Sequence, residues 1–84
     1  MQHKYDPLNE FLILAPAFQK EVLLSFEQLE LIINANLPPS AFKHSAWWSN
    51  AVDGVHVSAH AWEEAGWKVE HADRDHHWVR FIRQ

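Results

Sequence analysis

The fold is decided by the C-terminal stretch WKVEHADRDHHWVRFI, residues 67–82. Apolar and polar residues alternate over 67–71, which is the period of a half-buried strand. The polar segment Asp73-Arg74-Asp75 is typical of a turn, and residues 78–82 predict a second strand. Together these features predict a β-hairpin at the end of the chain.

The middle of the chain predicts two further helices. Apolar residues recur at helical spacing over 55–65, and Gly66 follows where a left-handed residue commonly ends a helix. Before that, Leu37-Pro38-Pro39-Ser40 predicts a turn, with Ser40 placed to cap a short helix over 41–46.

The N-terminal part predicts two helices separated by a strand. Asp6 followed by Pro7 is typical of a helix start with Asp6 as the N-cap, and Pro16 ends that helix. Residues 20–25 predict a strand. Ser25 and Gln28 then have the spacing of a capping box for a helix that ends near residues 34–36. The expected apolar face of the first helix consists of Leu8, Phe11, Leu12 and Ala15.

The order of these elements predicts one α+β domain over residues 1–84 that is winged-helix-like: helix, strand, two or three helices and a C-terminal hairpin. The early strand can join the hairpin as a three-stranded sheet. In a winged helix, residues 55–65 form the recognition helix and the turn over 73–76 forms the wing. Other α+β folds of this size share the same order of elements.

Composition excludes several classes of protein. Hydrophobic residues make up 48% and charged residues 21% of 84 residues, which excludes a disordered chain. The absence of cysteine excludes a disulfide framework, a thiolate zinc site and a cysteine nucleophile. No apolar run approaches the roughly 18–20 residues that span a membrane, and the first residues lack the pattern of a secretory signal. We therefore expect a cytoplasmic protein without a membrane segment.

Several motifs resemble those of an uncharacterised family of small bacterial and phage domains. They are distributed over nearly the whole chain, and the WWxN and AGW elements are unusual in composition. The resemblance implies no catalytic residue, cofactor or partner. The matching motifs are KYDPL (4–8), LSF (24–26), LPPSA (37–41), WWSN (47–50), AW (61–62), AGW (65–67) and VRF (79–81).

A nucleic-acid-associated function is the first hypothesis. The net charge is 7 − 11 = −4, but residues 68–84 carry four Lys or Arg against three Asp or Glu, or 4 − 3 = +1. Cations of the hairpin would hold phosphates, and the two adjacent tryptophans, of which one is expected to be partly exposed, would stack on bases. The candidate residues are Lys43, Trp47, Trp48, Asn50, Lys68, Arg74, Arg80 and Arg83.

A protein-interaction module is the alternative. Residues 44–67 carry three acidic residues, Asp53, Glu63 and Glu64, and no Lys or Arg, which is unfavourable for contacts to duplex DNA. Such an acidic face rich in tryptophan could dock on a basic protein of a nucleic-acid-handling complex, as a phage anti-defence inhibitor would.

The remaining chemistry is sparse. Trp62, Trp67 and Trp78 are expected in the core, because they lie on apolar faces of predicted elements. His56 and His60 have the i, i+4 spacing of two metal ligands, but the pattern lacks the other features of a metalloenzyme motif. No nucleophile or phosphate-binding motif accompanies them. We expect no metal, no cofactor and no enzymatic activity.

Overall fold

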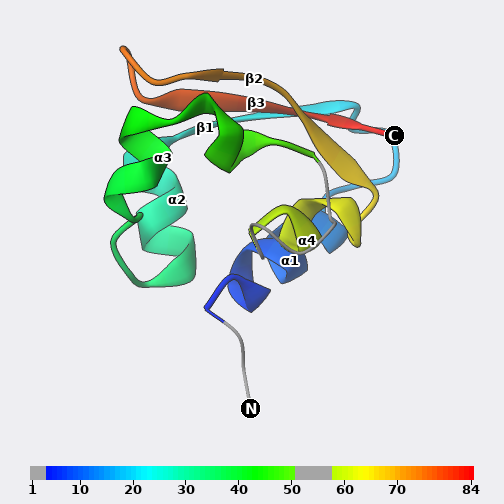
Figure 1. Ribbon diagram of the computed structural model, residues 1–84. Coiled ribbons are helices and arrows are strands. Elements are labelled where there is room, and N and C mark those ends of the chain that lie inside the picture. Colours follow the sequence, from blue (N-terminus) through cyan, green and yellow to red (C-terminus); the bar gives the residue numbers. More distant parts are fainter. Residues whose placement is uncertain (1–3, 51–57) are drawn as a thin grey trace.

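Three antiparallel strands form one layer, and helices pack on one face of it (Figure 1). The computed structural model describes residues 4–50 and 58–84. The elements are α1 (Asp6–Ile13), β1 (Glu21–Ser25), α2 (Phe26–Ile33), α3 (Pro39–Lys43), the 3-10 helix η1 (Ser45–Trp48), α4 (Ser58–Glu63), β2 (Trp67–Asp73) and β3 (Trp78–Arg83). The expected α+β domain with a C-terminal hairpin is confirmed. In Figure 1, α1, α2 and α4 lie below the sheet, and no described element lies above it.

The early strand joins the hairpin in a three-stranded sheet, as predicted. The strand order is β1-β3-β2, so β1 pairs with the last strand of the hairpin. Val22 pairs with Phe81 from one side, and Val69 pairs with Phe81 from the other. A bulge between Val69 and His71 interrupts the β2–β3 register. Both outer strands of the sheet, β1 and β2, therefore have one edge that no strand among residues 4–50 and 58–84 covers.

Local signals set most element boundaries. Ser25 and Gln28 form the predicted capping box, with Gln28 N–H donating to Ser25 Oγ over 3.0 Å and Ser25 N–H donating to Gln28 Oε1 over 2.8 Å. Asn34 (φ 53°) ends α2, and Gly66 (φ 86°) follows the last helical turn. Both residues adopt the left-handed conformation that glycine and asparagine tolerate best.

Two predicted N-caps are wrong. Asp6 lies inside α1, where Tyr5 takes the N-cap position without a side-chain capping hydrogen bond to the first turn. Ser40 lies inside α3, because Pro38 precedes the helix and Pro39 begins it. In each case a proline occupies the first or second position of the helix, where its missing N–H costs no hydrogen bond.

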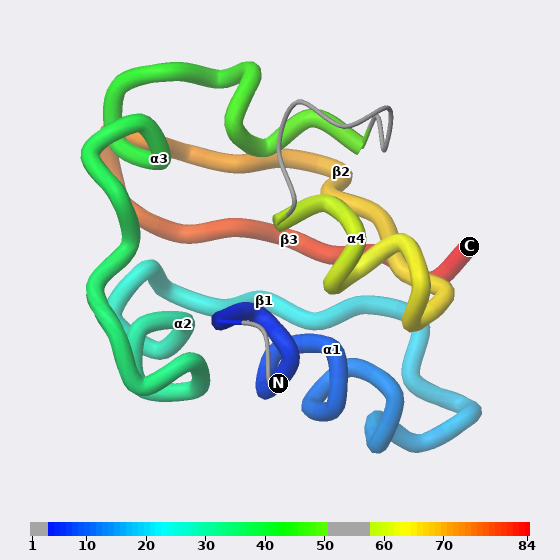
Figure 2. The backbone as a smooth tube through the Cα atoms, turned by 60° about the horizontal axis from the view of Figure 1, so that its bottom comes forward, coloured from blue at the N-terminus to red at the C-terminus, as the bar shows by residue number. Residues whose placement is uncertain are grey.

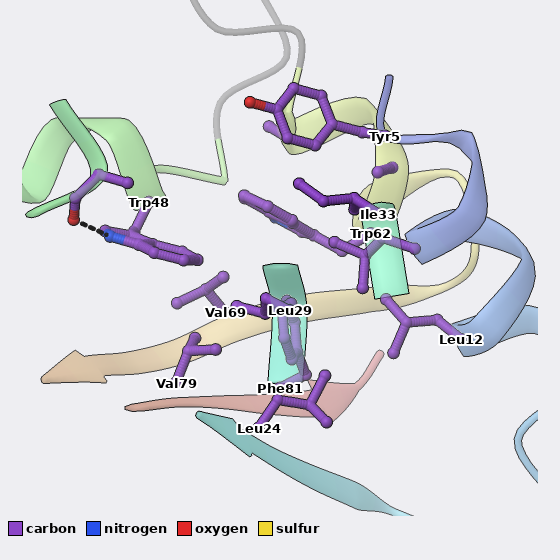
Figure 3. Close-up of a cluster of buried hydrophobic side chains, with 14 of the residues drawn as sticks. Tyr5, Leu12, Leu24, Leu29, Ile33, Trp48, Trp62, Val69, Val79 and Phe81 are labelled. Atoms are coloured by element: carbon purple, nitrogen blue, oxygen red, sulfur yellow. Dashed lines mark hydrogen bonds between the residues drawn. The ribbon is translucent and has the colours of Figure 1, made fainter. Parts of the chain in front are cut away.

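The core lies between the helices and the inner face of the sheet (Figure 3). Trp62 and Trp67 are fully buried, as predicted, and Trp62 packs 5.7 Å from the ring of Phe81. Trp78 is only partly buried, which corrects its assignment to the core. It alternates with the inward-facing Val79 and so points to the opposite, open face of the sheet. No helix in the described ranges is both long and apolar enough to cross a membrane.

Candidate functional site

The two adjacent tryptophans are both buried, so the expectation that one would be exposed is wrong. Trp47 is 6% and Trp48 is 4% exposed. The predicted helix over 41–46 ends at Lys43, and His44 is extended before η1 begins. The last two residues of the 3-10 turn are buried in the core, where Trp47 packs on Tyr5 at 5.9 Å and Trp48 stacks on Phe26 at 5.1 Å between ring centres. Neither ring is available to stack on a base.

Asn50 is held by three hydrogen bonds to the protein. Its Oδ1 accepts from Trp62 Nε1 over 3.0 Å and from the Val69 N–H over 2.8 Å. Its Nδ2 donates to the Val69 carbonyl over 2.9 Å. The amide that was expected to contact a base or a partner therefore satisfies the outward-facing backbone of β2.

Two of the predicted phosphate-binding arginines have partners within the chain. Arg80 forms an ion pair with Glu21 on β1, and its Nε lies 3.7 Å from Glu70 Oε2 on β2. Arg74 Nη1 donates to the carbonyl of Lys43 over 2.8 Å, which ties the hairpin turn to the end of α3. Lys43 itself is exposed.

The third arginine of the hairpin, Arg83, also has partners within the chain. Its guanidinium donates to the carbonyls of Gln19 and Pro16, each over 2.9 Å, and lies 4.4 Å from the centre of the Trp67 ring. Lys68 is exposed on β2. The four hairpin cations thus do not form one free basic patch, because three of them have acidic or carbonyl partners.

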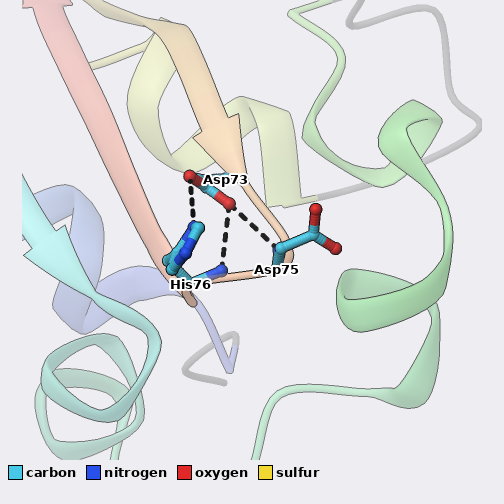
Figure 4. Close-up of polar contacts among 3 residues, drawn as sticks. All are labelled: Asp73, Asp75 and His76. Atoms are coloured by element: carbon cyan, nitrogen blue, oxygen red, sulfur yellow. Dashed lines mark hydrogen bonds and ion pairs between the residues drawn. The ribbon is translucent and has the colours of Figure 1, made fainter.

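The turn of the hairpin is organised around one carboxylate (Figure 4). Asp73 Oδ1 accepts from the N–H groups of Asp75 and His76, over 3.0 and 2.9 Å, and Oδ2 lies 3.0 Å from His76 Nδ1. These bonds, led by the one from the His76 backbone, hold the pKa of Asp73 below its ordinary value. Asp73 therefore stabilises the predicted wing.

The predicted acidic face is only partly described. The Glu63 carboxylate accepts from Gln84 Nε2 over 2.7 Å. The side chain of Glu64 is 70% exposed, and its Oε1 lies 3.5 Å from His60 Nδ1. Asp53 and His56 lie outside the described residues. Within the ranges 4–50 and 58–84, no three His, Asp or Glu side chains are placed to hold a metal ion.

The surface that sequence reasoning missed is apolar. Leu14 is 81% exposed and Phe18 is 83% exposed, and the connection that carries them projects from the rest of the chain in Figure 2. All exposed large hydrophobic side chains of the described chain lie within residues 11–31: Phe11, Ile13, Leu14, Phe18, Leu23 and Leu31. A hollow beside this connection is lined by Phe11, Leu14, Ala15, Pro16, Gln19 and Val22.

One signal for this surface was present in the sequence. The first helix has apolar residues at 11, 13 and 14 in addition to the buried Leu8 and Leu12. A helix this short cannot bury residues on all its sides against one sheet. The excess predicts that some of its apolar residues face solvent or a partner.

The chain matches the model of a protein family over residues 5–84, and the family is described as a domain of unknown function (DUF7662). The chain therefore belongs to this family. No curated protein and no solved structure matches it.

Proposed function

We propose that this domain functions by binding another protein, through the apolar surface formed by Phe11, Leu14 and Phe18. We call this the α1 surface. The observation that carries the proposal is the exposure of Leu14 and Phe18, each above 80%, in a domain whose other large apolar residues are mostly in the core. Clustered apolar side chains of this size on a small domain are typical of interaction sites.

The electrostatic arrangement supports a protein partner over a nucleic acid. Binding to phosphates requires cations that are free to displace counterions. Arg80 has two carboxylate neighbours, and Arg83 is bound to two carbonyls. The net charge of −4 also opposes an approach to DNA.

A nucleic-acid role has one specific observation in its favour, on the open face of the sheet. Trp78 is partly exposed there, and its ring lies 5.3 Å from the ring of His71, with the exposed Lys68 on the same strand as His71. Aromatic rings on an open sheet can stack on single-stranded bases. This second candidate replaces Trp47 and Trp48 with Trp78 as the stacking residue.

The test of the α1 surface compares two variants in partner binding. The first variant is Leu14→Ser with Phe18→Ser, and the matched control is Ile13→Ser, since Ile13 is also exposed but belongs neither to the α1 surface nor to the hollow. Partners captured from cells that naturally make the protein are purified, and their affinities are measured by calorimetry. We expect the double variant to lose at least about tenfold in affinity, or about 1.4 kcal/mol.

Two outcomes would contradict the proposal. One is an equal affinity of the wild type and the folded double variant for every purified partner. The other is tight binding to single-stranded DNA that weakens steeply with salt and is lost in Trp78→Ala, because that result would assign the function to the open face of the sheet.

A further inference from the structure

The two edges of the sheet differ in how their backbone groups are satisfied. On β2, the side chain of Asn50 bonds both the N–H and the carbonyl of Val69, so the centre of this edge is occupied. Among the described residues, no side chain bonds both the N–H and the carbonyl of one residue at the outer edge of β1. An open edge is a template for pairing with another strand.

The hydrogen bonds at its two ends show which groups of β1 face outward. The Arg83 N–H donates to the Lys20 carbonyl, and the Phe26 N–H donates to the His77 carbonyl, each over 2.9 Å. In an antiparallel ladder the direction alternates from residue to residue. Lys20 and Phe26 face β3, so the even residues between them do as well. The backbone groups of Glu21, Leu23 and Ser25 therefore point to the open edge.

Glutamine side chains cover the two ends of this edge and leave its centre open. Gln19 Nε2 donates to the Glu21 carbonyl over 3.1 Å, and Gln28 Oε1 accepts from the Ser25 N–H over 2.8 Å. From the described residues, no hydrogen bond reaches the outward N–H or carbonyl of Leu23. One residue at the middle of the strand thus offers both a donor and an acceptor.

Apolar surface flanks the open edge on both sides. The Leu23 side chain is 57% exposed on the open face of the sheet. On the other side, the hollow at Val22 is lined by Phe11 and Leu14 of the α1 surface. A second apolar hollow is lined by Leu23, Leu24, Ser25, Gln28 and Trp78. Figure 2 shows that β1 is the strand nearest to α1 and α2, which carry Phe11 and Gln28.

We propose that a second copy of this chain pairs with β1 in antiparallel orientation, with the two-fold axis at Leu23. This inference rests on the proposed function and names the partner of the α1 surface. The N–H and carbonyl of Leu23 then bond the carbonyl and N–H of Leu23 in the other copy, which satisfies all four groups at once. The two sheets become one sheet of six strands.

The register is compatible in charge and in side-chain type. A two-fold axis at Leu23 places Glu21 opposite Ser25 of the other copy, so no like charges face each other. The two Leu23 side chains meet on the open face of the sheet. When the second copy binds, the Glu21 carbonyl and the Ser25 N–H can release Gln19 and Gln28 and bond the backbone of the other copy instead.

The test uses a charge at the position on the axis. Leu23→Lys places two ammonium groups opposite each other, whereas Ile13→Lys makes the same change at a residue with the same exposure, 57%. By sedimentation velocity, we expect wild type and Ile13→Lys to have the mass of two chains and Leu23→Lys to have the mass of one. Mixing Leu23→Lys with Leu23→Glu should restore the dimer, because the two charges then face each other.

A cysteine at the same position tests the register independently of charge. The chain has no cysteine of its own. Opposed residues in a hydrogen-bonded antiparallel pair have Cα atoms about 5.5 Å apart, within the roughly 4.4–6.8 Å that a disulfide spans. Oxidised Leu23→Cys should therefore run as a covalent dimer on a non-reducing gel, and Ile13→Cys should remain a monomer.

Failure of this inference is distinguishable from failure of the proposed function. A monomeric wild type at high concentration overturns the inference, as does a dimer that Leu23→Lys leaves intact or that the mixed variants fail to restore. In those cases the proposed function still stands if a different purified protein binds and the α1-surface variant weakens that binding. If the wild type is monomeric and binds no protein, both are wrong.

Discussion

The carboxamide of Asn50 pairs with the backbone of Val69 as a residue of a neighbouring strand would. It accepts from the Val69 N–H over 2.8 Å and donates to the Val69 carbonyl over 2.9 Å, while its oxygen also accepts from Trp62 Nε1. One side chain therefore closes the edge of β2 and bonds the fully buried indole of Trp62. This relationship predicts that Asn50 contributes to the stability of the fold.

We expect Asn50→Ala to lower the free energy of unfolding by about 2–3 kcal/mol, because it leaves partly buried donors and an acceptor without partners. Asn50→Asp keeps the acceptor and loses the donor to Val69, so its free energy of unfolding should lie between those of wild type and Asn50→Ala. Urea unfolding followed by tryptophan fluorescence measures both values. Asn36→Ala, at an exposed position, is the control and should stay within about 0.5 kcal/mol of wild type. Equal midpoints for Asn50→Ala and Asn36→Ala would contradict the prediction.

Arg83 is expected to contribute to stability by fixing the connection between α1 and β1. Arg83→Ala removes two bonds to carbonyls and the contact with the Trp67 ring, so we expect a loss of about 1–2 kcal/mol in the free energy of unfolding. Lys68→Ala removes an exposed cation from the same hairpin and should have little effect. Thermal unfolding of the two variants at the same salt concentration makes the comparison. A destabilisation by Lys68→Ala as large as that by Arg83→Ala would refute it.

Asp73 is expected to make the hairpin sensitive to acid. Hydrogen bonds led by the His76 backbone N–H hold its pKa below the ordinary value, so the folded state binds this proton less readily than the unfolded state. Its contribution is present above the unfolded pKa, about 4, and is lost as the pH falls through the lower folded value. Melting temperatures from neutral pH down to about pH 2 should therefore decrease less in Asp73→Asn than in wild type.

The control for this experiment is Asp75→Asn. Asp75 contributes its backbone N–H to the turn, and its carboxylate points away from Asp73 (Figure 4). This variant should follow the acid dependence of wild type. If Asp75→Asn and Asp73→Asn behave alike, the acid dependence does not come from the turn bonds of Asp73.

Several features set by a few neighbouring residues were predicted correctly, although the N-caps of α1 and α3 were not. The capping box of Ser25 and Gln28, the left-handed Gly66 and the alternation in the hairpin all form as expected. Their geometry depends on residues close in sequence, where backbone sterics and short hydrogen bonds dominate. The same applies to the burial of Trp62, which follows from its place on the apolar face of a helix.

The candidate site could not be predicted in this way. A sequence shows how many arginines the hairpin has, but the partners of Arg83 are 64 and 67 residues away. Likewise, helical geometry would point Trp47 and Trp48 in different directions, and both are buried only because Tyr5 and Phe26, distant in sequence, pack on them. The exposure of Leu14 and Phe18 depends on what the rest of the chain leaves uncovered.

By itself, the sequence determined the order of helices and strands, the hairpin and most of the core, because these depend on hydrophobic period and on capping and turn residues. Tertiary structure decided which polar groups were already bonded and which apolar side chains remained outside. It closed the β2 edge with Asn50 and left the β1 edge open at Leu23. The physical reason is that hydrogen-bond partners and burial are properties of residues distant in sequence, which meet only when the sheet and helices pack.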